Sequence, residues 1–284
     1  MNTEIIDGLT IVQGSRSLDL YPNDKFLLRA LNLGDPSNRE VTRPQVGRHG
    51  LVDETQFMGE RGVSIGLRIL EKPFARVLDE LNAFRDPGYR SELRLRMPGR
   101  DERILIVRPD QFSSPIGMDS RITLDWMGQW KAPDPRFYSM DVNRTLLFPG
   151  ETEPGRDYDL TFDRDYPFSE GVGVMEVNNR GNVGVYPVIR IFGPCTNPKI
   201  ANETSGKVLH FDDLTIADGD YLDIRPLSRT IRLNSLPEQN RYRHLNTSIS
   251  EWFLIRPGKQ DIRFYPSTAS EPSVAEISFR SAWI

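Results

Sequence analysis

The sequence has little of the chemistry that disulfides and metal sites need. Its 284 residues include one cysteine, Cys195, and three histidines, His49, His210 and His244. An intramolecular disulfide is excluded, and the histidines are far apart with no ligand spacing, so we expect neither a metal site nor a cofactor. Cys195 is expected to be a small buried or half-buried residue rather than a nucleophile.

Long apolar runs are also missing. No segment approaches the ~20 apolar residues that a membrane span requires. The N-terminal stretch "MNTEIIDGLT" has neither the basic start nor the apolar centre of a signal peptide. The sequence also has no P-loop and no Gly-x-Ser-x-Gly elbow. We therefore expect no membrane insertion, no secretion signal and no catalytic motif of these kinds.

An excess of charge of one sign is absent from the first half of the chain. Residues 1–140 carry 20 basic and 20 acidic groups, a balance of zero, and residues 141–284 carry 16 and 20, a balance of −4. Neither half has the basic excess of a nucleic-acid-binding domain.

Glycine and proline are frequent, at 22 and 21 residues, which predicts many turns and short strands. The stretch "RGVSIGLRILE" alternates, with Val63, Ile65, Leu67 and Ile69 on one face. Further along, "TLDWMGQW" is expected to contain a bulge or bend near Met127 and Gly128. The second half holds about nine short alternating segments with no helical pattern between them, so it predicts an antiparallel β-sandwich.

One segment has a helical period. In residues 73–85, an apolar stripe is formed by Phe74, Val77, Leu78, Leu81 and Phe84. Pro73 suits the first helical turn, and "DPG" at 86–88 ends the pattern. The polar stretch 34–50 is expected to be a long loop, and its role cannot be deduced from the sequence. The first half is therefore predicted to be a β-rich domain with one helix.

The composition and the frequency of turn-forming residues change around the stretch "WKAPDPRFYS", residues 130–139. It is followed by "FPGETEPG", which is rich in proline, glycine and glutamate. A domain boundary near residues 132–150 explains this change better than an active site does. We expect two domains, 1–140 and 141–284.

Acidic and aromatic residues leave two alternative functions open. Two carboxylates from the clusters of acidic residues could serve as the acid and base of a glycosidase if they are held ~5–9 Å apart. The clusters could also bind calcium, although the favoured interpretation is that they form a solvated rim. Exposed aromatics on a sandwich sheet could bind a sugar, so a carbohydrate-binding module and a glycoside hydrolase remain alternatives. The acidic groups are Asp157, Asp159, Asp163 and Asp165, and Asp212, Asp213, Asp218 and Asp220; the aromatic candidates are Tyr158, Tyr221, Tyr242 and Trp252.

The order of several turns resembles the siphophage distal tail protein family. A strand ending in glycine leads to an Asn-Pro turn, a glycine hairpin and a Gly-Asp turn, and later a Trp-x-x-Leu-x-Pro-Gly segment precedes an apolar strand. A Trp followed by an Asp-Pro-Arg-aromatic element closes the family's N-terminal domain. The matching positions here are Gly193, Asn197, Pro198, Gly206, Gly219, Asp220, Trp252, Pro257 and Gly258, and Trp130, Asp134, Pro135, Arg136 and Phe137.

The resemblance implies a structural virion protein rather than an enzyme. Residues 1–140 would form a belt domain, six copies of which close into a ring, and residues 141–284 a galectin-like or carbohydrate-module-like sandwich. The ring would join the tail tube and tape-measure proteins to tail-tip or receptor-binding proteins, and DNA would pass through it. The protein would be made in the host cytoplasm and reside in the tail tip, with weak glycan binding possible. We also expect Trp130 and Phe137 to pack at the joint between the domains, and Arg136 to bond backbone carbonyls or a carboxylate.

Overall fold

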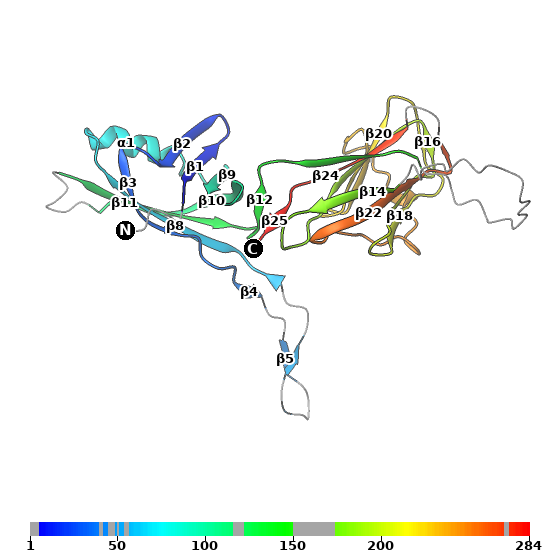
Figure 1. Ribbon diagram of the computed structural model, residues 1–284, viewed down its shortest axis with the longest axis horizontal. Helices are drawn as coiled ribbons and strands as arrows, with labels where there is room; N and C mark the ends of the chain where they lie inside the picture. The colour runs from blue at the N-terminus through cyan, green and yellow to red at the C-terminus, as the bar shows by residue number, and fades with distance from the viewer. Residues whose placement is uncertain are drawn as a thin grey trace, which may run out of the picture. The chain divides into compact units, whose positions relative to one another are not determined.

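The computed structural model describes residues 6–39, 42–44, 49, 51–53, 57–115, 122–149, 174–269 and 273–284. The chain divides into two compact units, Met1–Met140 with Ile284, and Asp141–Trp283. We call them unit 1 and unit 2. Both are built mainly from antiparallel strands, so the predicted mainly β fold class is confirmed (Figure 1). In the described part of the chain, no helix is long and apolar enough to cross a membrane.

Unit 1 is a twisted antiparallel sheet with one helix. The sheet has the order β2-β1-β9-β10-β11-β8-β3, and β12 also pairs with β10. The described elements are β1 (Gly8–Gln13), β2 (Arg16–Tyr21), β3 (Phe26–Asn32), β4 (Asn38–Arg39), β5 (Thr42–Pro44), β6 (Leu51–Asp53), β7 (Phe57–Met58), β8 (Arg61–Ile69), α1 (Phe74–Asn82), β9 (Ser91–Arg96), β10 (Arg103–Ser113), β11 (Leu124–Ala132) and β12 (Phe137–Ser139).

Side-chain alternation places the core of unit 1 on one face of this sheet. In β8, the four alternating aliphatic residues Val63–Ile69 are all buried, and the residues between them include the half-buried Ser64 and Arg68. Helix α1 lies inside the expected range 73–85 and buries Val77 and Leu81. The helical stripe therefore belongs to the hydrophobic core.

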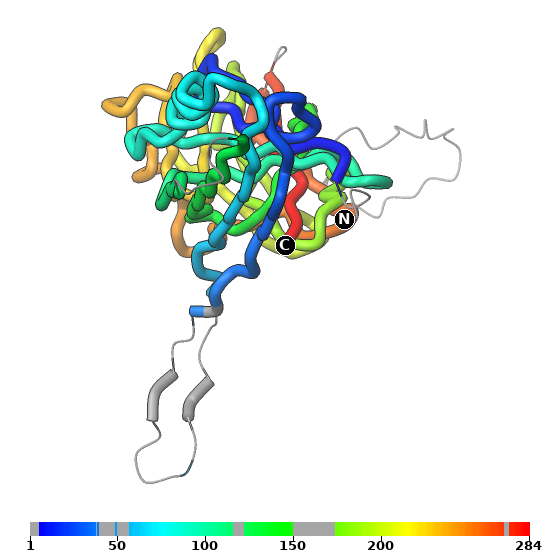
Figure 2. The backbone as a smooth tube through the Cα atoms, turned by 90° about the vertical axis from the view of Figure 1, so that its left-hand side faces the viewer, coloured from blue at the N-terminus to red at the C-terminus, as the bar shows by residue number. Residues whose placement is uncertain are grey.

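The stretch 34–50 is not the long loop that its polar composition predicts. Strands β4 and β7 pair as Asn38↔Met58 and Arg39↔Phe57, and β5 pairs with β6 further along the same hairpin. Figures 1 and 2 show β3 and β8 running side by side toward β4 and β7. The described residues of this stretch therefore include two short paired strands, β4 and β5.

The expected irregularity near Met127 and Gly128 lies in the neighbouring strand instead. β11 alternates regularly between buried and exposed positions throughout. The register shift falls in β10, between Pro109 and Phe112, opposite Gln129. Proline cannot donate a ladder hydrogen bond, which fits a bulge in β10.

Unit 2 consists of antiparallel sheets, as predicted. Its larger sheets have the orders β13-β24-β15-β20-β21 and β14-β22-β17-β18, and a smaller sheet has the order β19-β16-β23. The described elements are β13 (Asn143–Leu147), β14 (Val174–Asn179), β15 (Val188–Phe192), β16 (Cys195–Thr196), β17 (Lys199–Asn202), β18 (Lys207–His210), β19 (Thr215–Ile216), β20 (Tyr221–Arg225), β21 (Thr230–Leu233), the 3-10 turn η3 (Tyr242–His244), β22 (Gly258–Tyr265), β23 (Thr268–Ala269), β24 (Val274–Phe279) and β25 (Ala282–Trp283).

Each of the two larger sheets of unit 2 buries one set of alternating side chains. Ile189 and Ile191 of β15 are fully buried, as are Ile262 and Phe264 of β22. The residues between them are half-buried or exposed. Two sheets with one apolar face each bury those faces against one another, which is the arrangement of a sandwich. The outer face of the β14-β22-β17-β18 sheet remains polar.

Candidate functional site

Three aromatic rings pack on one face of β10 and β11. The Trp126 and Trp130 ring centroids are 6.0 Å apart, and the Phe112 ring lies 5.1 Å from Trp130 at a nearly perpendicular angle. Gly128 separates the two tryptophans, and a Cβ there would lie 2.5 Å from a ring carbon of each. Glycine at this position therefore lets two large rings share the face of one strand.

After β11 the chain turns around the carboxylate of Asp134. Arg136 donates from Nε to Oδ1 at 2.7 Å and from Nη2 to Oδ2 at 2.7 Å, and the Tyr138 hydroxyl donates to Oδ2 at 2.5 Å. The structure therefore gives Arg136 a carboxylate partner two residues away. Trp130, by contrast, belongs to the aromatic cluster of the preceding strand.

A residue that sequence reasoning missed holds this turn from the other side. Arg61 is 4% exposed. Its guanidinium donates from Nε to the Pro135 carbonyl at 2.9 Å and from Nη1 to the carbonyls of Leu33 and Gly34 at 3.3 and 2.5 Å. Its central carbon also lies 4.9 Å from the centroid of the Phe137 ring. Arg61 thus makes the contacts to backbone carbonyls that we considered for Arg136.

The sequence contains a signal for the burial of Arg61. It precedes Val63 and Ile65 by two and four residues, so it shares their inward phase in β8. Burial lowers the pKa of its guanidinium, and the Asp35 carboxylate opposes this shift. The group nevertheless stays charged at neutral pH, because an arginine side chain ordinarily titrates above about pH 12.

The Asp134 turn predicts a pH-dependent part of the stability of unit 1. Burial raises the pKa of Asp134, but hydrogen bonds from Arg136 and Tyr138 outweigh it, so the pKa is lowered. A lowered pKa stabilises the fold above the unfolded-state value near 3.9, and this stabilisation is lost as the pH falls through the folded-state pKa. We expect Asp134→Asn to unfold more easily than wild type at pH 7 by about 1 kcal/mol.

The difference in the free energy of unfolding between wild type and Asp134→Asn should shrink as the pH falls below about 4. Urea unfolding across that pH range measures it. Asp125→Asn is the matched control, because it breaks the more exposed surface pair with Arg68 and should cost less. If the difference in the free energy of unfolding between wild type and Asp134→Asn stayed constant down to low pH, the stabilising role of the Asp134 carboxylate would be contradicted.

In unit 2, the residues of the predicted sandwich turn motif lie at separate turns rather than in one cluster. Gly193 follows β15, and a Cβ there would lie 2.1 Å from the Ala217 carbonyl oxygen. Gly206 and Gly219 adopt positive φ in the β17–β18 and β19–β20 turns. Asn197 and Pro198 lie between β16 and β17, and Asp220 lies just before β20. Trp252 and Pro257 precede β22, and Gly258 is its first residue.

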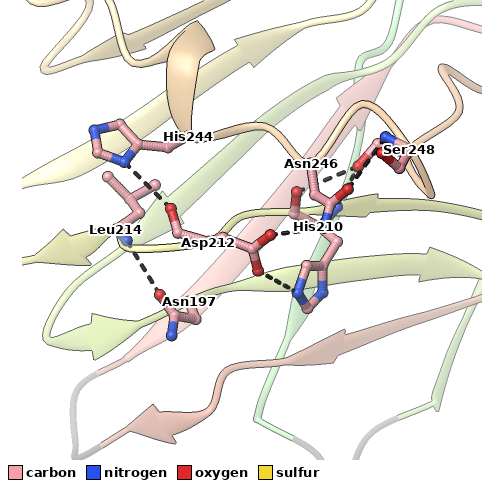
Figure 3. A network of polar contacts seen from close by, with 8 residues as sticks. Asn197, His210, Asp212, Leu214, His244, Asn246 and Ser248 are labelled. Atoms are coloured by element: carbon pink, nitrogen blue, oxygen red, sulfur yellow. Dashed lines mark hydrogen bonds and ion pairs between the residues drawn. The ribbon is translucent and has the colours of Figure 1, made fainter.

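Asn197 connects with a polar network that fastens loops of unit 2 together (Figure 3). Its side-chain oxygen accepts from the Leu214 backbone N–H at 3.1 Å. The Asp212 carboxylate meets Nε2 of His210 at 2.8 Å and accepts from the Asn246 amide at 2.7 Å, while the His244 ring contacts the Asp212 carbonyl. The network thus holds the segment after η3 against the end of β18.

Two members of the second acidic group, Asp212 and Asp220, make structural contacts in these turns. Asp212 belongs to the network, and Oδ1 of Asp220 accepts from the Asn234 amide at 2.8 Å. Among the residues that the structure describes, no group of three or more His, Cys, Asp or Glu side chains could hold a metal ion. The first acidic group, Asp157 to Asp165, lies outside the described residues.

The aromatic candidates do not gather on one sheet face. Tyr242, in η3, stacks with Trp252 at 6.4 Å between centroids, whereas Tyr221, in β20, contacts Phe192 of β15. Tyr158 lies outside the described residues. Cys195 is buried, and burial raises the pKa of its thiol, which disfavours the nucleophilic thiolate.

A groove of about 790 Å³ with a mixed polar and apolar lining lies over the outer face of the β14-β22-β17-β18 sheet. Strand register arranges its lining in rows. Lys199 is paired with Tyr265 on one side and with His210 on the other, and the next row pairs Ala201 with Arg263. Sequence reasoning did not find this groove, because its rows join residues about 60 positions apart in the sequence.

Comparisons with known proteins agree with this architecture. The family described as "Siphovirus-type tail component, C-terminal domain" matches residues 180–283. No curated protein matches the sequence. Among solved structures, the chain is similar to the Dit protein of phage SPP1, described as a paradigm of the hub adsorption apparatus in phages that infect Gram-positive bacteria. The identity is 14%, with a TM-score of 0.64 over 96% of this chain and 98% of that one.

Two chains from the baseplate of phage P2 in its activated conformation, with calcium and with strontium, are also similar. Their identities are 12% and 11%, with TM-scores of 0.46 and 0.47, and they cover 95% and 98% of this chain and 97% and 99% of theirs. The family match covers most of unit 2, and the SPP1 Dit fold extends over both units. The predicted resemblance to the siphophage distal tail protein family is therefore confirmed: residues 180–283 match the siphovirus-type tail component family, and the chain shares the fold of the SPP1 Dit protein over nearly its full length.

Proposed function

We propose that the protein is the hub of a long-tailed phage's tail tip, in which six copies of unit 1 close into a ring and unit 2 is carried on it. The observation that carries this proposal is the correspondence in fold, over nearly the full length of both chains, with a protein described as a hub. The ring joins the tail tube and tape-measure proteins to tail-tip or receptor-binding proteins. The protein is made in the host cytoplasm and incorporated into the virion.

The ends of the unit 1 sheet support a ring contact between identical chains. Within the described residues, β2 pairs only with β1, and β3 pairs only with β8. A free strand edge is a template for pairing with another chain. When the contact joins two different surfaces of identical subunits, it closes into a ring if the rotation between them permits.

The charge of residues 1–140 suits a ring through which DNA passes. This part of the chain has equal numbers of basic and acidic residues. A lumen with a strong basic excess would bind the phosphate backbone and hold the DNA during ejection. A balanced surface avoids that retention.

The ring is tested on the full chain by light scattering and negative-stain electron microscopy over a range of concentrations. We expect closed particles of six copies with a central hole. Twofold dimers or open filaments would overturn the proposal. If the isolated chain stays monomeric, cross-linking in purified tails tests whether copies of it contact one another there. Absence of the protein from the tail tip would also overturn the proposal.

A matched pair of variants tests the β3 edge. Leu27 lies in β3 and Leu70 follows β8, and their exposures are similar at 46% and 47%. Leu27→Lys places a charge on the proposed edge and should reduce ring formation about tenfold or more, because edge lysines oppose strand pairing. Leu70→Lys should assemble like wild type, and equal loss in both variants would argue against an edge contact.

A further inference from the structure

We propose that the groove on the outer face of the β14-β22-β17-β18 sheet binds a sugar chain that bears acidic groups. This inference goes beyond the proposed hub function, because it concerns a site within one unit 2 and does not need a ring. The ligand class follows from three properties of the groove: a ring that lies along its floor, an unpaired cation, and a separation of charge along its length.

The aromatic ring is that of Tyr265. Its hydroxyl donates to Glu203 Oε1 at 2.8 Å and accepts from Nη1 of Arg263 at 3.1 Å. To reach Glu203 from the opposite end of the groove, the Tyr265 side chain must extend along the sheet rather than stand out from it. A tyrosine held in this way offers an apolar ring and polar groups to the same ligand, as sugar sites require.

The cation is Lys199. Its ammonium lies 5.5 Å from the centroid of the Tyr265 ring, and among the described residues it makes no ion pair. Other lysines near this sheet are paired: Lys207 with Glu251 at 2.6 Å and Lys259 with Glu176 at 2.8 Å. Lys199 is a half-buried residue, and an ammonium without a carboxylate partner in a groove favours an anionic group on the ligand.

Charge is separated along the groove by strand register. Lys199 and His210 share one row and Arg263 lies in the next, whereas Asp261 and Glu203 lie beyond it at the other end. Lys207 also lines that other end, but its ammonium is paired with Glu251. An acidic group of the ligand fits the basic end. Carboxylates at the other end accept hydrogen bonds from hydroxyl groups, which a sugar supplies.

The acidic group could be a carboxylate or a phosphodiester, because both meet an ammonium in the same way. The probes are therefore a short oligogalacturonate, its methyl ester, which is the same sugar without charge, and a poly(glycerol phosphate) oligomer. Binding to the full chain is measured by isothermal titration calorimetry at low salt. We expect millimolar or tighter binding of at least one acidic probe and much weaker binding of the ester.

Lys199→Gln should weaken binding of the acidic probe about tenfold. Lys259→Gln is the control, because Lys259 lies on the neighbouring strand β22 and on the same face of the sheet, but outside the groove, in an exposed pair with Glu176. Thermal unfolding of both variants checks that they fold. Equal binding of acid and ester, equal binding by wild type and Lys199→Gln, or no binding of either acidic probe would overturn the proposal and leave the ring hypothesis unaffected.

Discussion

Arg61→Ala is expected to destabilise unit 1 by about 3 kcal/mol, because the change strands several buried acceptors at once. The guanidinium donates to three carbonyls, on Leu33, Gly34 and Pro135, from a side chain that is almost fully buried. Alanine cannot replace these donors, and it leaves a cavity beside the Phe137 ring. The turn after β11 and the chain after β3 would both lose their common anchor.

The measurement is guanidinium-induced unfolding followed by tryptophan fluorescence. Trp126 and Trp130 report on unit 1, whereas Trp252 and Trp283 report on unit 2, so the transition of unit 1 should move alone. Arg61→Lys should recover only part of the loss, because an ammonium lacks the planar fork that serves separated carbonyls.

The matched control is Arg76→Ala. Arg76 has a side chain that is 74% exposed and forms a 3.8 Å pair with Glu80 one helical turn away. Surface pairs of this type contribute about 0.5 kcal/mol or less. If Arg61→Ala unfolded no more easily than Arg76→Ala, the anchoring role assigned to Arg61 would be wrong.

The parts of the fold that sequence could predict are those with a strong local period. The i, i+2 pattern of Val63 to Ile69 specified a half-buried strand, and the stripe from Phe74 to Phe84 specified the helix. Both patterns work because the side-chain period of each element is fixed by its backbone geometry. The turn glycines were likewise visible, since positive φ favours glycine in particular.

Features that depend on long-range pairing were not predictable in this way. The strands β4 to β7 are only two or three residues long, which is too short for a hydrophobic period to show. Arg61 contacts Pro135 only because β8 pairs with β11 and brings Arg61 opposite Ala132. The groove similarly combines Lys199 with Tyr265 through the register of β17 and β22.

Gly193→Ala is expected to destabilise unit 2 by about 3 kcal/mol through a steric clash with the backbone. An added Cβ would lie 2.1 Å from the Ala217 carbonyl oxygen and 2.7 Å from that of Ile216. Neither atom belongs to a flexible side chain, so relief requires β15 and the β19–β20 turn to separate. The same approach allows the Gly193 N–H to donate to the Asp220 carbonyl at 3.0 Å, and a shift would weaken that bond too.

Gly206→Ala is the control in the same unit, because it introduces backbone strain without steric crowding. Gly206 has a φ of +69° and no neighbouring atom within 4 Å of an added Cβ, so alanine there meets only the strain of the left-handed conformation, about 1 kcal/mol. Chemical denaturation followed through Trp252 and Trp283 compares the two variants. Gly193→Ala should lose clearly more stability than Gly206→Ala, and the reverse order would mean that the close approach of Gly193 to Ala217 does not hold the sandwich together. If the predicted order is found, the glycine at the end of β15 is required for the packing of two chain segments, and its role in the turn alone does not account for it.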